Sequence, residues 1–115
     1  NNLEMLCSSN TFYETIDRVS TISSEKFRTV KLEISDNTCT VSSFGEENAI
    51  GTEQISVQYS GPKININFNA RYILDVLSIL KNEELSFAFA NDTAPTIIKS
   101  NKKQNSLYLI MQMRA

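Results

Sequence analysis

The residues at the end of the chain have the most suggestive types and spacing for binding chemistry. Leu109, Met111 and Met113 occupy alternate positions, so a strand here places all three side chains on one face. Methionine is unbranched and polarizable, and it is common where one surface accepts several partners. The spacing indicates an adaptable apolar groove. A last strand packed in the core is the alternative interpretation.

The residue types used most often in catalysis are missing or isolated. The chain has no histidine, which removes the commonest general base and the commonest neutral metal ligand. Cys7 and Cys39 lack metal-ligand spacing, and none of the three glycines opens a helix as a phosphate-binding loop requires. Asp75, Glu83 and Glu84 are typical of a solvated helix end. The sequence predicts neither enzymatic activity nor a bound cofactor.

Composition and charge restrict the class of protein. The 115 residues are 41% hydrophobic and 21% charged, which fits one globular domain that buries about two-thirds of its unfolded surface. No apolar stretch approaches the ~18 residues of a membrane span, and the two cysteines fit buried thiols of a reducing compartment. A net charge of −2 argues against tight binding of nucleic acid over the whole surface. We therefore expect a cytoplasmic protein without membrane contact.

Two amphipathic helices are expected to position the binding residues. The first is predicted over Thr11–Ile22, with Thr11 as its cap and a buried stripe that repeats every three to four residues. Its only cation is Arg18. The second helix is predicted over Ala70–Lys81, behind an Asn69 cap.

Period-two alternation predicts the strands that hold these helices. Each half of the chain supplies one helix and about four strands, an α+β pattern with the helices on one face of antiparallel sheets. The expected strands lie at Leu3–Cys7, Val30–Ile34, Cys39–Ser43, within Ala49–Tyr59, and at Ile64–Phe68, Leu85–Ala90, Thr96–Ser100 and Leu107–Met113.

Several motifs in combination give the chain a family resemblance. They are the segment Ile66–Leu77, which reads INFNARYILDVL, together with Glu25–Arg28, Tyr59–Gly61 and Met111–Arg114. From Leu3 to Ala115 the chain resembles the third, C-terminal domain of the bacterial sliding clamp, the β subunit of DNA polymerase III.

The resemblance implies a replication processivity factor with the DNA-clamp fold, in which two helices pack on two antiparallel sheets. In this family two subunits of three similar domains close into a ring, with the helices around duplex DNA. Residues 1–115 would be the third domain without the first and second, monomeric alone and part of a homodimer in the full-length protein. Arg18 and Arg71 are the DNA-facing candidates, and Thr21 and Ile22 match positions at the subunit boundary.

The resemblance also implies a peptide-binding cleft between the second and third domains. In the family, DNA polymerase, clamp-loader subunits and repair proteins insert a short peptide with apolar anchors there. A free-standing α+β adaptor or structural domain, with no role on DNA, is the alternative interpretation. The positions that match the cleft are Phe27, Asn69, Tyr72, Pro95, Leu109, Met111, Met113 and Arg114.

Overall fold

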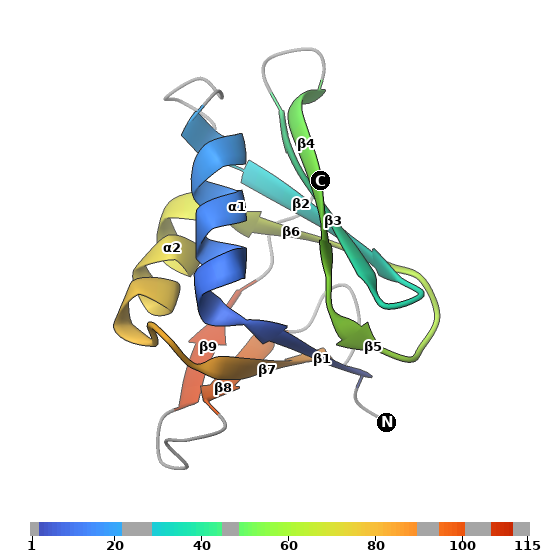
Figure 1. Cartoon of the computed structure of the whole chain (residues 1–115), viewed down its shortest axis with the longest axis vertical. Helices are drawn as coiled ribbons and strands as arrows, with labels where there is room; N and C mark the ends of the chain where they lie inside the picture. Colours follow the sequence, from blue (N-terminus) through green and yellow to red (C-terminus); the bar gives the residue numbers. More distant parts are fainter. Residues whose placement is uncertain (1–2, 22–28, 45–48, 90–94, 101–106, 112–115) are drawn as a thin grey trace.

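Two helices lie side by side, and the strands form two antiparallel sheets against them (Figure 1). The computed structural model describes residues 3–21, 29–44, 49–89, 95–100 and 107–111. The predicted fold class, α+β with two helices packed on two antiparallel sheets, is confirmed.

The first sheet has five strands and joins the two halves of the chain. Met5 on its second strand pairs with Tyr59 on one side and with Phe87 on the other. The spatial order is β5 (Gln58–Tyr59), β1 (Leu3–Ser8), β7 (Glu84–Phe89), β8 (Thr96–Ser100) and β9 (Leu107–Ile110). The last strand was predicted to reach Met113. Its ladder ends at Ile110, and residues 112–115 lie outside the described part of the chain.

The second sheet has four strands, and its central hairpin was correctly predicted. Asp36 and Asn37 form the turn with φ of 50° and 60°, a left-handed conformation that Asp and Asn tolerate better than most residues. The strand predicted within Ala49–Tyr59 divides in two at buried Val57, where the chain crosses between the sheets. The spatial order is β4 (Ala49–Ser56), β3 (Thr38–Phe44), β2 (Thr29–Ser35) and β6 (Ile64–Asn69).

The first helix, α1 (Ser9–Thr21), begins two residues earlier than predicted. Its first turn is capped by Ser8, whose hydroxyl oxygen accepts from the Thr11 amide at 3.5 Å, so the predicted cap at Thr11 is wrong. Helix α1 starts here because the Ser9 amide donates to the Glu83 carbonyl at 2.9 Å, and the Ser9 hydroxyl accepts from the Glu83 amide at 3.2 Å. A tertiary contact therefore selects the helix start.

The second helix, α2 (Ala70–Ile79), has the predicted cap. The Asn69 side-chain oxygen accepts from the amides of Arg71 and Tyr72 at 2.9 and 3.3 Å, which satisfies two donors of the first turn. The helix ends two residues before the predicted Lys81.

The core lies between the helices and the inner faces of both sheets. Phe87 is fully buried and meets Phe12 of α1 edge to face, with ring centroids 5.2 Å apart, the geometry that aromatic quadrupoles favour. Cys7 and Cys39 are buried and unpaired, as predicted. The inner residues of both sheets are alternate ones, which is why the period-two pattern identified the strands.

Candidate functional site

One flank of α2 is apolar and only partly covered. Tyr72, Val76 and Ile79 follow one another at helical spacing, four and three residues apart; Val76 is partly buried against the core, and Ile73 and Leu77 are buried on the adjacent face. Tyr72 is 62% exposed and Ile79 is 57% exposed. The two ends of this stripe, Tyr72 and Ile79, are thus apolar side chains that the core does not cover.

The last strand, β9, has a matching apolar face. Leu107 and Leu109 are exposed, while Ile110 between Leu109 and Met111 is buried. Met111 directly follows β9 and is 62% exposed. Because alternate residues share a face, the strand buries one set of side chains and presents the other outward. Strand β9 therefore packs in the core with one face and exposes the other. The groove and the core-strand interpretations of the alternating residues each describe one of these faces.

These two stripes come from neighbouring elements, since α2 contacts β9. All the large hydrophobic side chains that are exposed in the described part of the chain come from these two neighbouring segments. Exposed apolar clusters of this kind mark interaction sites. We call this cluster the α2–β9 surface, and its members are Tyr72, Ile79, Leu107, Leu109 and Met111.

The structure brings four of the predicted cleft residues together. Tyr72, Leu109 and Met111 belong to the α2–β9 surface, and Asn69 caps the helix that presents Tyr72. Since its side-chain oxygen already accepts two backbone amides, only the amide nitrogen of Asn69 is left to face a ligand.

The remaining cleft predictions have different outcomes. Pro95 is half-buried and leads into β8, whose first residue pairs with Ile110 of β9. Phe27, Met113 and Arg114 lie outside the described residues, so their places in the cleft remain predictions.

Sequence reasoning missed two members of the surface, Ile79 and Leu107. Their signals were present in the chain, because Ile79 lies seven residues after Tyr72 and Leu107 lies two residues before Leu109. Recognising them required knowing which helix flank and which sheet face stay open, and this follows from the tertiary arrangement.

The DNA-facing candidate on α1 has a carboxylate partner. Arg18 donates to both oxygens of Glu53 on β4, with distances of 3.0 Å from Nε to Oε2 and 2.8 Å from Nη2 to Oε1. Glu53 lies on the inner side of edge strand β4, opposite buried Val41. An inward-pointing charge of this kind is one way in which edge strands avoid unwanted pairing.

This ion pair shifts both of its pKa values. The hydrogen bonds from Arg18 lower the pKa of Glu53, and the same bonds raise the pKa of Arg18. Both side chains remain exposed enough for solvent to screen them. A phosphate that binds through Nε or Nη2 of Arg18 therefore competes with Glu53.

The other DNA-facing candidate, Arg71, is exposed on the first turn of α2. Asp75 lies one turn later, at ion-pair spacing, yet the two side chains form no salt bridge in the described structure. Thr21 is the last residue of α1, and Ile22 falls outside the described residues. The DNA-facing and subunit-boundary roles of these residues remain predictions.

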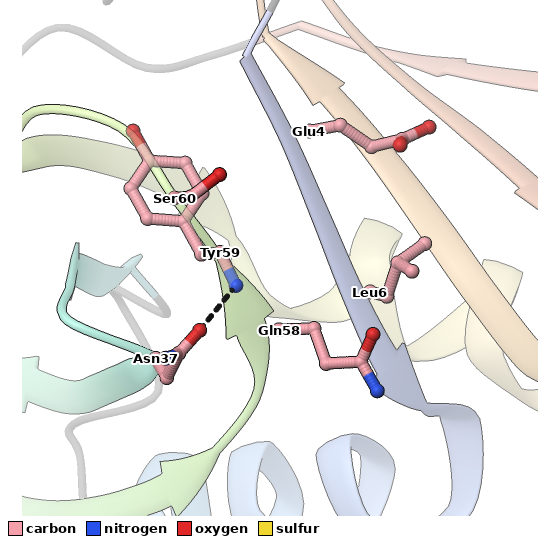
Figure 2. Close-up of a pocket in the computed structure, with 6 residues that line it drawn as sticks. All are labelled: Glu4, Leu6, Asn37, Gln58, Tyr59 and Ser60. Carbon is pink, nitrogen blue, oxygen red and sulfur yellow. Dashed lines mark hydrogen bonds between the residues drawn. The ribbon is translucent and has the colours of Figure 1, made fainter.

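A separate pocket of about 370 Å³ lies at the opposite edge of the five-stranded sheet, where β1 and β5 meet the hairpin turn. Figure 2 shows Glu4 and Leu6 projecting from β1, and the Asn37 side chain turned toward the backbone of Tyr59. The Asn37 oxygen accepts from the Tyr59 amide at 2.9 Å. The pocket contains none of the predicted site residues, and its hydrogen bond connects the two sheets.

The described residues contain no group of three or more His, Cys, Asp or Glu side chains that could hold a metal ion. Burial raises the pKa of the Cys39 thiol to about 12 and raises that of Cys7 further, so neither is a ready nucleophile. No helix in this part of the chain is long and apolar enough to cross a membrane.

The paired helices, the two antiparallel sheets and the apolar surface between the second helix and the last strand define a domain of the DNA-clamp class. Residues 1–114 match the family described as DNA polymerase III beta subunit, C-terminal domain. The chain belongs to this family, which consists of non-catalytic processivity factors.

Characterised relatives agree with this assignment. The chain is 35% identical over 103 residues to the beta sliding clamp of Caulobacter vibrioides, a match covering 90% of this chain and 28% of that protein. It is 34% identical over 97 residues to the beta sliding clamp of Escherichia coli K12, covering 84% of this chain and 26% of that protein. The chain thus spans just over a quarter of the length of these relatives.

Solved structures show the same fold. Caulobacter crescentus pol III beta superposes with a TM-score of 0.92 and 32% identity, covering 98% of this chain and 30% of that one. A sliding clamp from Bartonella birtlesii bound to griselimycin superposes with a TM-score of 0.91 and 29% identity, again covering 98% of this chain and 30% of that one. The DNA-clamp fold predicted from the resemblance is confirmed.

Proposed function

We propose that this chain is the third domain of a sliding clamp that keeps a replicative DNA polymerase on its template. The observation that carries the proposal is the α2–β9 surface, because a domain of this family has little other reason to keep five large apolar side chains in water. Relatives that are all beta sliding clamps give no support to a free-standing adaptor.

The α2–β9 surface is the half of a peptide-binding cleft that this domain contributes. Its apolar side chains take the anchors of a short peptide, and the amide of Asn69 together with Arg114 binds the polar groups between them. Such peptides come from DNA polymerase, clamp-loader subunits and repair proteins. A ligand-bound relative, the clamp holding griselimycin, supports the idea that clamps of this family bind compact ligands of this kind.

Contact with DNA is topological and independent of sequence. The full-length protein closes as a homodimer around duplex DNA, with Thr21 and Ile22 at the subunit boundary, while this domain alone is monomeric. Arg71 and Arg18 touch phosphates from the inner surface. Since Arg18 already pairs with Glu53, its phosphate contact is weak, which suits a ring that slides.

The proposal includes a non-catalytic role, without a cofactor and without membrane contact, in the bacterial cytoplasm. The family is non-catalytic, and the buried thiols would remain reduced there.

The direct test measures binding of a fluorescent peptide with a glutamine and spaced Leu and Phe anchors. Met111→Ala and Tyr72→Ala should each weaken binding by about 2 kcal/mol, roughly thirtyfold, because each truncates a central anchor contact. Gln54→Ala, on an exposed position of the other sheet, is the matched control and should bind like the parent.

A second measurement tests the role on DNA. The full-length protein, loaded by a clamp loader, should remain on circular duplex DNA and should leave after the circle is linearised. Peptide binding unaffected by both anchor variants, or release from closed circles at the same rate as from linear DNA, would refute the proposed function.

A further inference from the structure

Strand β8 lies beside β9, which carries the exposed Leu109 (Figure 1). The register places Ile97 of β8 directly opposite Leu109, so their side chains share a face and their Cβ atoms are about 5 Å apart. Thr96 and Ile98, on either side of Ile97, are fully buried. Since alternate residues of a strand point to opposite faces, Ile97 belongs to the outward face of the sheet.

The register makes Ile97 one of a group of four neighbouring apolar residues. Pro95 and Met111 each lie one residue beyond the last pair of the β8–β9 ladder, so they are the next positions on the same face. The family resemblance predicted Pro95, Leu109 and Met111 in the cleft, but it did not include Ile97. Ile97 is half-buried, so part of its side chain remains open to an occupant.

The apolar row that contains Ile97 crosses three strands. On its other side Ile97 is opposite Ala88 of β7, whose side chain is a single methyl group. Ala88, Ile97 and Leu109 together span two strand spacings, about 10 Å. Beyond Ala88 the row ends at Glu4 of β1, whose carboxylate accepts a hydrogen bond from Ser86. The row is therefore wide enough to receive one large apolar side chain.

The next row on the same face carries a positive charge. Lys99 lies two residues after Ile97, is exposed, and is directly opposite Leu107 of β9. Among the described residues it forms no salt bridge. Residues two apart in a strand are separated by about 7 Å, so a group beside an anchor on Ile97 is within reach of the Lys99 ammonium. A carboxylate is the group that this charge favours.

We propose that β8 supplies part of the peptide-binding cleft, with Ile97 contacting an apolar anchor of the peptide and Lys99 favouring an acidic residue next to that anchor. The inference rests on the proposed function, and it specifies which peptides the domain prefers. The occupant is a peptide because Ile97 is continuous with Leu109 and Met111, to which the proposed function assigns peptide anchors. Charge complementarity to Lys99 gives the sequence preference.

The first test measures how tightly the full-length protein binds the fluorescent peptide with a glutamine and spaced Leu and Phe anchors. Ile97→Ala should weaken binding about tenfold, because it truncates a contact with one anchor. Leu6→Ala is the matched control, since Leu6 is also half-buried and apolar on the outward face of this sheet but lies on β1. Its affinity should stay within about twofold of the parent.

A second measurement separates direct contact from a change in the fold. The isoleucine methyl signals of the full-length protein are recorded with and without the peptide, and Ile97→Val and Ile34→Val identify two of them. Peptide binding should shift the Ile97 signal. It should leave the signal of Ile34, which is fully buried in the other sheet, unchanged.

The role of Lys99 is tested with peptides that carry Asp either before the first anchor or after the last one. Each is compared with a peptide that has Asn at the same place. One Asp peptide should bind about fivefold more tightly than its Asn counterpart at low salt and lose much of this preference at high salt, because salt screens the attraction. Lys99→Gln should remove the preference, whereas Lys63→Gln, which alters an exposed lysine paired with Glu33, should leave it unchanged.

The outcomes separate this inference from the proposed function. If the peptide binds the parent but Ile97→Ala has no effect, has no more effect than Leu6→Ala, or the Ile97 signal does not shift, β8 is not part of the cleft. If neither Asp peptide is preferred, or if the preference survives Lys99→Gln, the acidic part of the inference is wrong. If the peptide does not bind the parent protein, the proposed peptide-binding function fails, and the role of β8 fails with it.

Discussion

The outward faces of the two sheets differ in chemistry although both are made of short antiparallel strands. On the four-stranded sheet the outward side chains are polar, and Thr52 donates to Ser42 while Gln54 donates to Thr40, each at 3.4 Å. On the five-stranded sheet the β1 end is mixed, since Ser86 donates to Glu4 at 2.6 Å while half-buried Leu6 shares that face. Its other end, along β9, is apolar.

This contrast shows what a solvated sheet face looks like in this chain. On the four-stranded sheet the outward positions are Thr, Ser, Asn, Gln, Lys and Glu, all of which can hydrogen-bond. Leu107 and Leu109 occupy equivalent outward positions on β9 and are 55% and 59% exposed. The apolar character of Leu107 and Leu109 at exposed positions agrees with the peptide-binding role proposed for this surface.

The largest expected effect concerns the inner face of the five-stranded sheet. Phe87→Ala removes a fully buried ring that packs against Phe12 and Phe89. It should lower the free energy of unfolding by about 3–5 kcal/mol, through lost transfer energy and the cavity left behind. Urea denaturation measures the change. A loss below about 1 kcal/mol would mean that the inner and outer faces of this sheet are not as distinct as described.

The second effect tests whether the inner faces are equally buried despite their different outer faces. Cys7 lies inside the five-stranded sheet and Cys39 inside the four-stranded one. The pKa of Cys39 rises from 9.0 to about 12, so at pH 8 its thiolate fraction is about a thousandfold lower than that of a free thiol. Both thiols should react with a disulfide reagent only after unfolding.

The same pKa shift makes stability depend on pH in a defined direction. A thiol whose pKa is raised by folding contributes stability below its unfolded pKa, and that contribution is lost as pH rises through the folded value. The free energy of unfolding of the parent protein should therefore fall between pH 9 and pH 12. It should fall more steeply with pH than that of the Cys39→Ala variant, which lacks this thiol. Rapid labelling of the native protein at pH 8 would contradict the burial of both thiols.

Much of the fold was predictable from the sequence because periodicity and caps act locally. The alternation of Val30 with polar residues identified the hairpin, and Asn69 before an apolar stripe identified the start of α2. The start of α1 was not predictable, since residues 8–11 all have side-chain oxygens that can cap a helix. The contact between Ser9 and Glu83, 74 residues apart, decided it.

The site was predictable to a similar extent. The alternation at the chain end indicated that Leu109 and Met111 share a face, and both are exposed. The pairing of Arg18 with Glu53 joins positions 35 residues apart, which spacing along the chain cannot reveal. Exposure of Ile79 likewise depends on which flank of α2 the sheets leave open.

The third effect tests the connection between the two sheets. Asn37 lies in the hairpin turn of the four-stranded sheet. Its side-chain oxygen accepts a hydrogen bond from the Tyr59 amide of the five-stranded sheet, and its backbone carbonyl accepts one from the Val57 amide. Asn37→Gly keeps the left-handed turn but loses the side-chain acceptor, and should cost about 1 kcal/mol. Asn37→Ala should cost about 1 kcal/mol more, because alanine is strained at a φ of 60°. Thermal unfolding of the two variants separates these contributions, and equal losses would show that backbone strain plays no part.

The smallest effect on stability sharpens the comparison most. Leu109→Ser on the apolar face and Gln54→Ala on the polar face both alter exposed side chains, so each should change the free energy of unfolding by only about 0.5 kcal/mol. Their effects on peptide binding should differ, because only Leu109 belongs to the cleft proposed to bind the peptide anchors. Leu109→Ser should weaken binding at least tenfold, whereas Gln54→Ala should leave it unchanged, as anisotropy titration would show.

If Leu109→Ser instead destabilises the domain by several kcal/mol and binding is lost only in proportion to unfolding, then β9 is a core strand on both faces. The difference between the two sheets would then reflect packing, and not recognition.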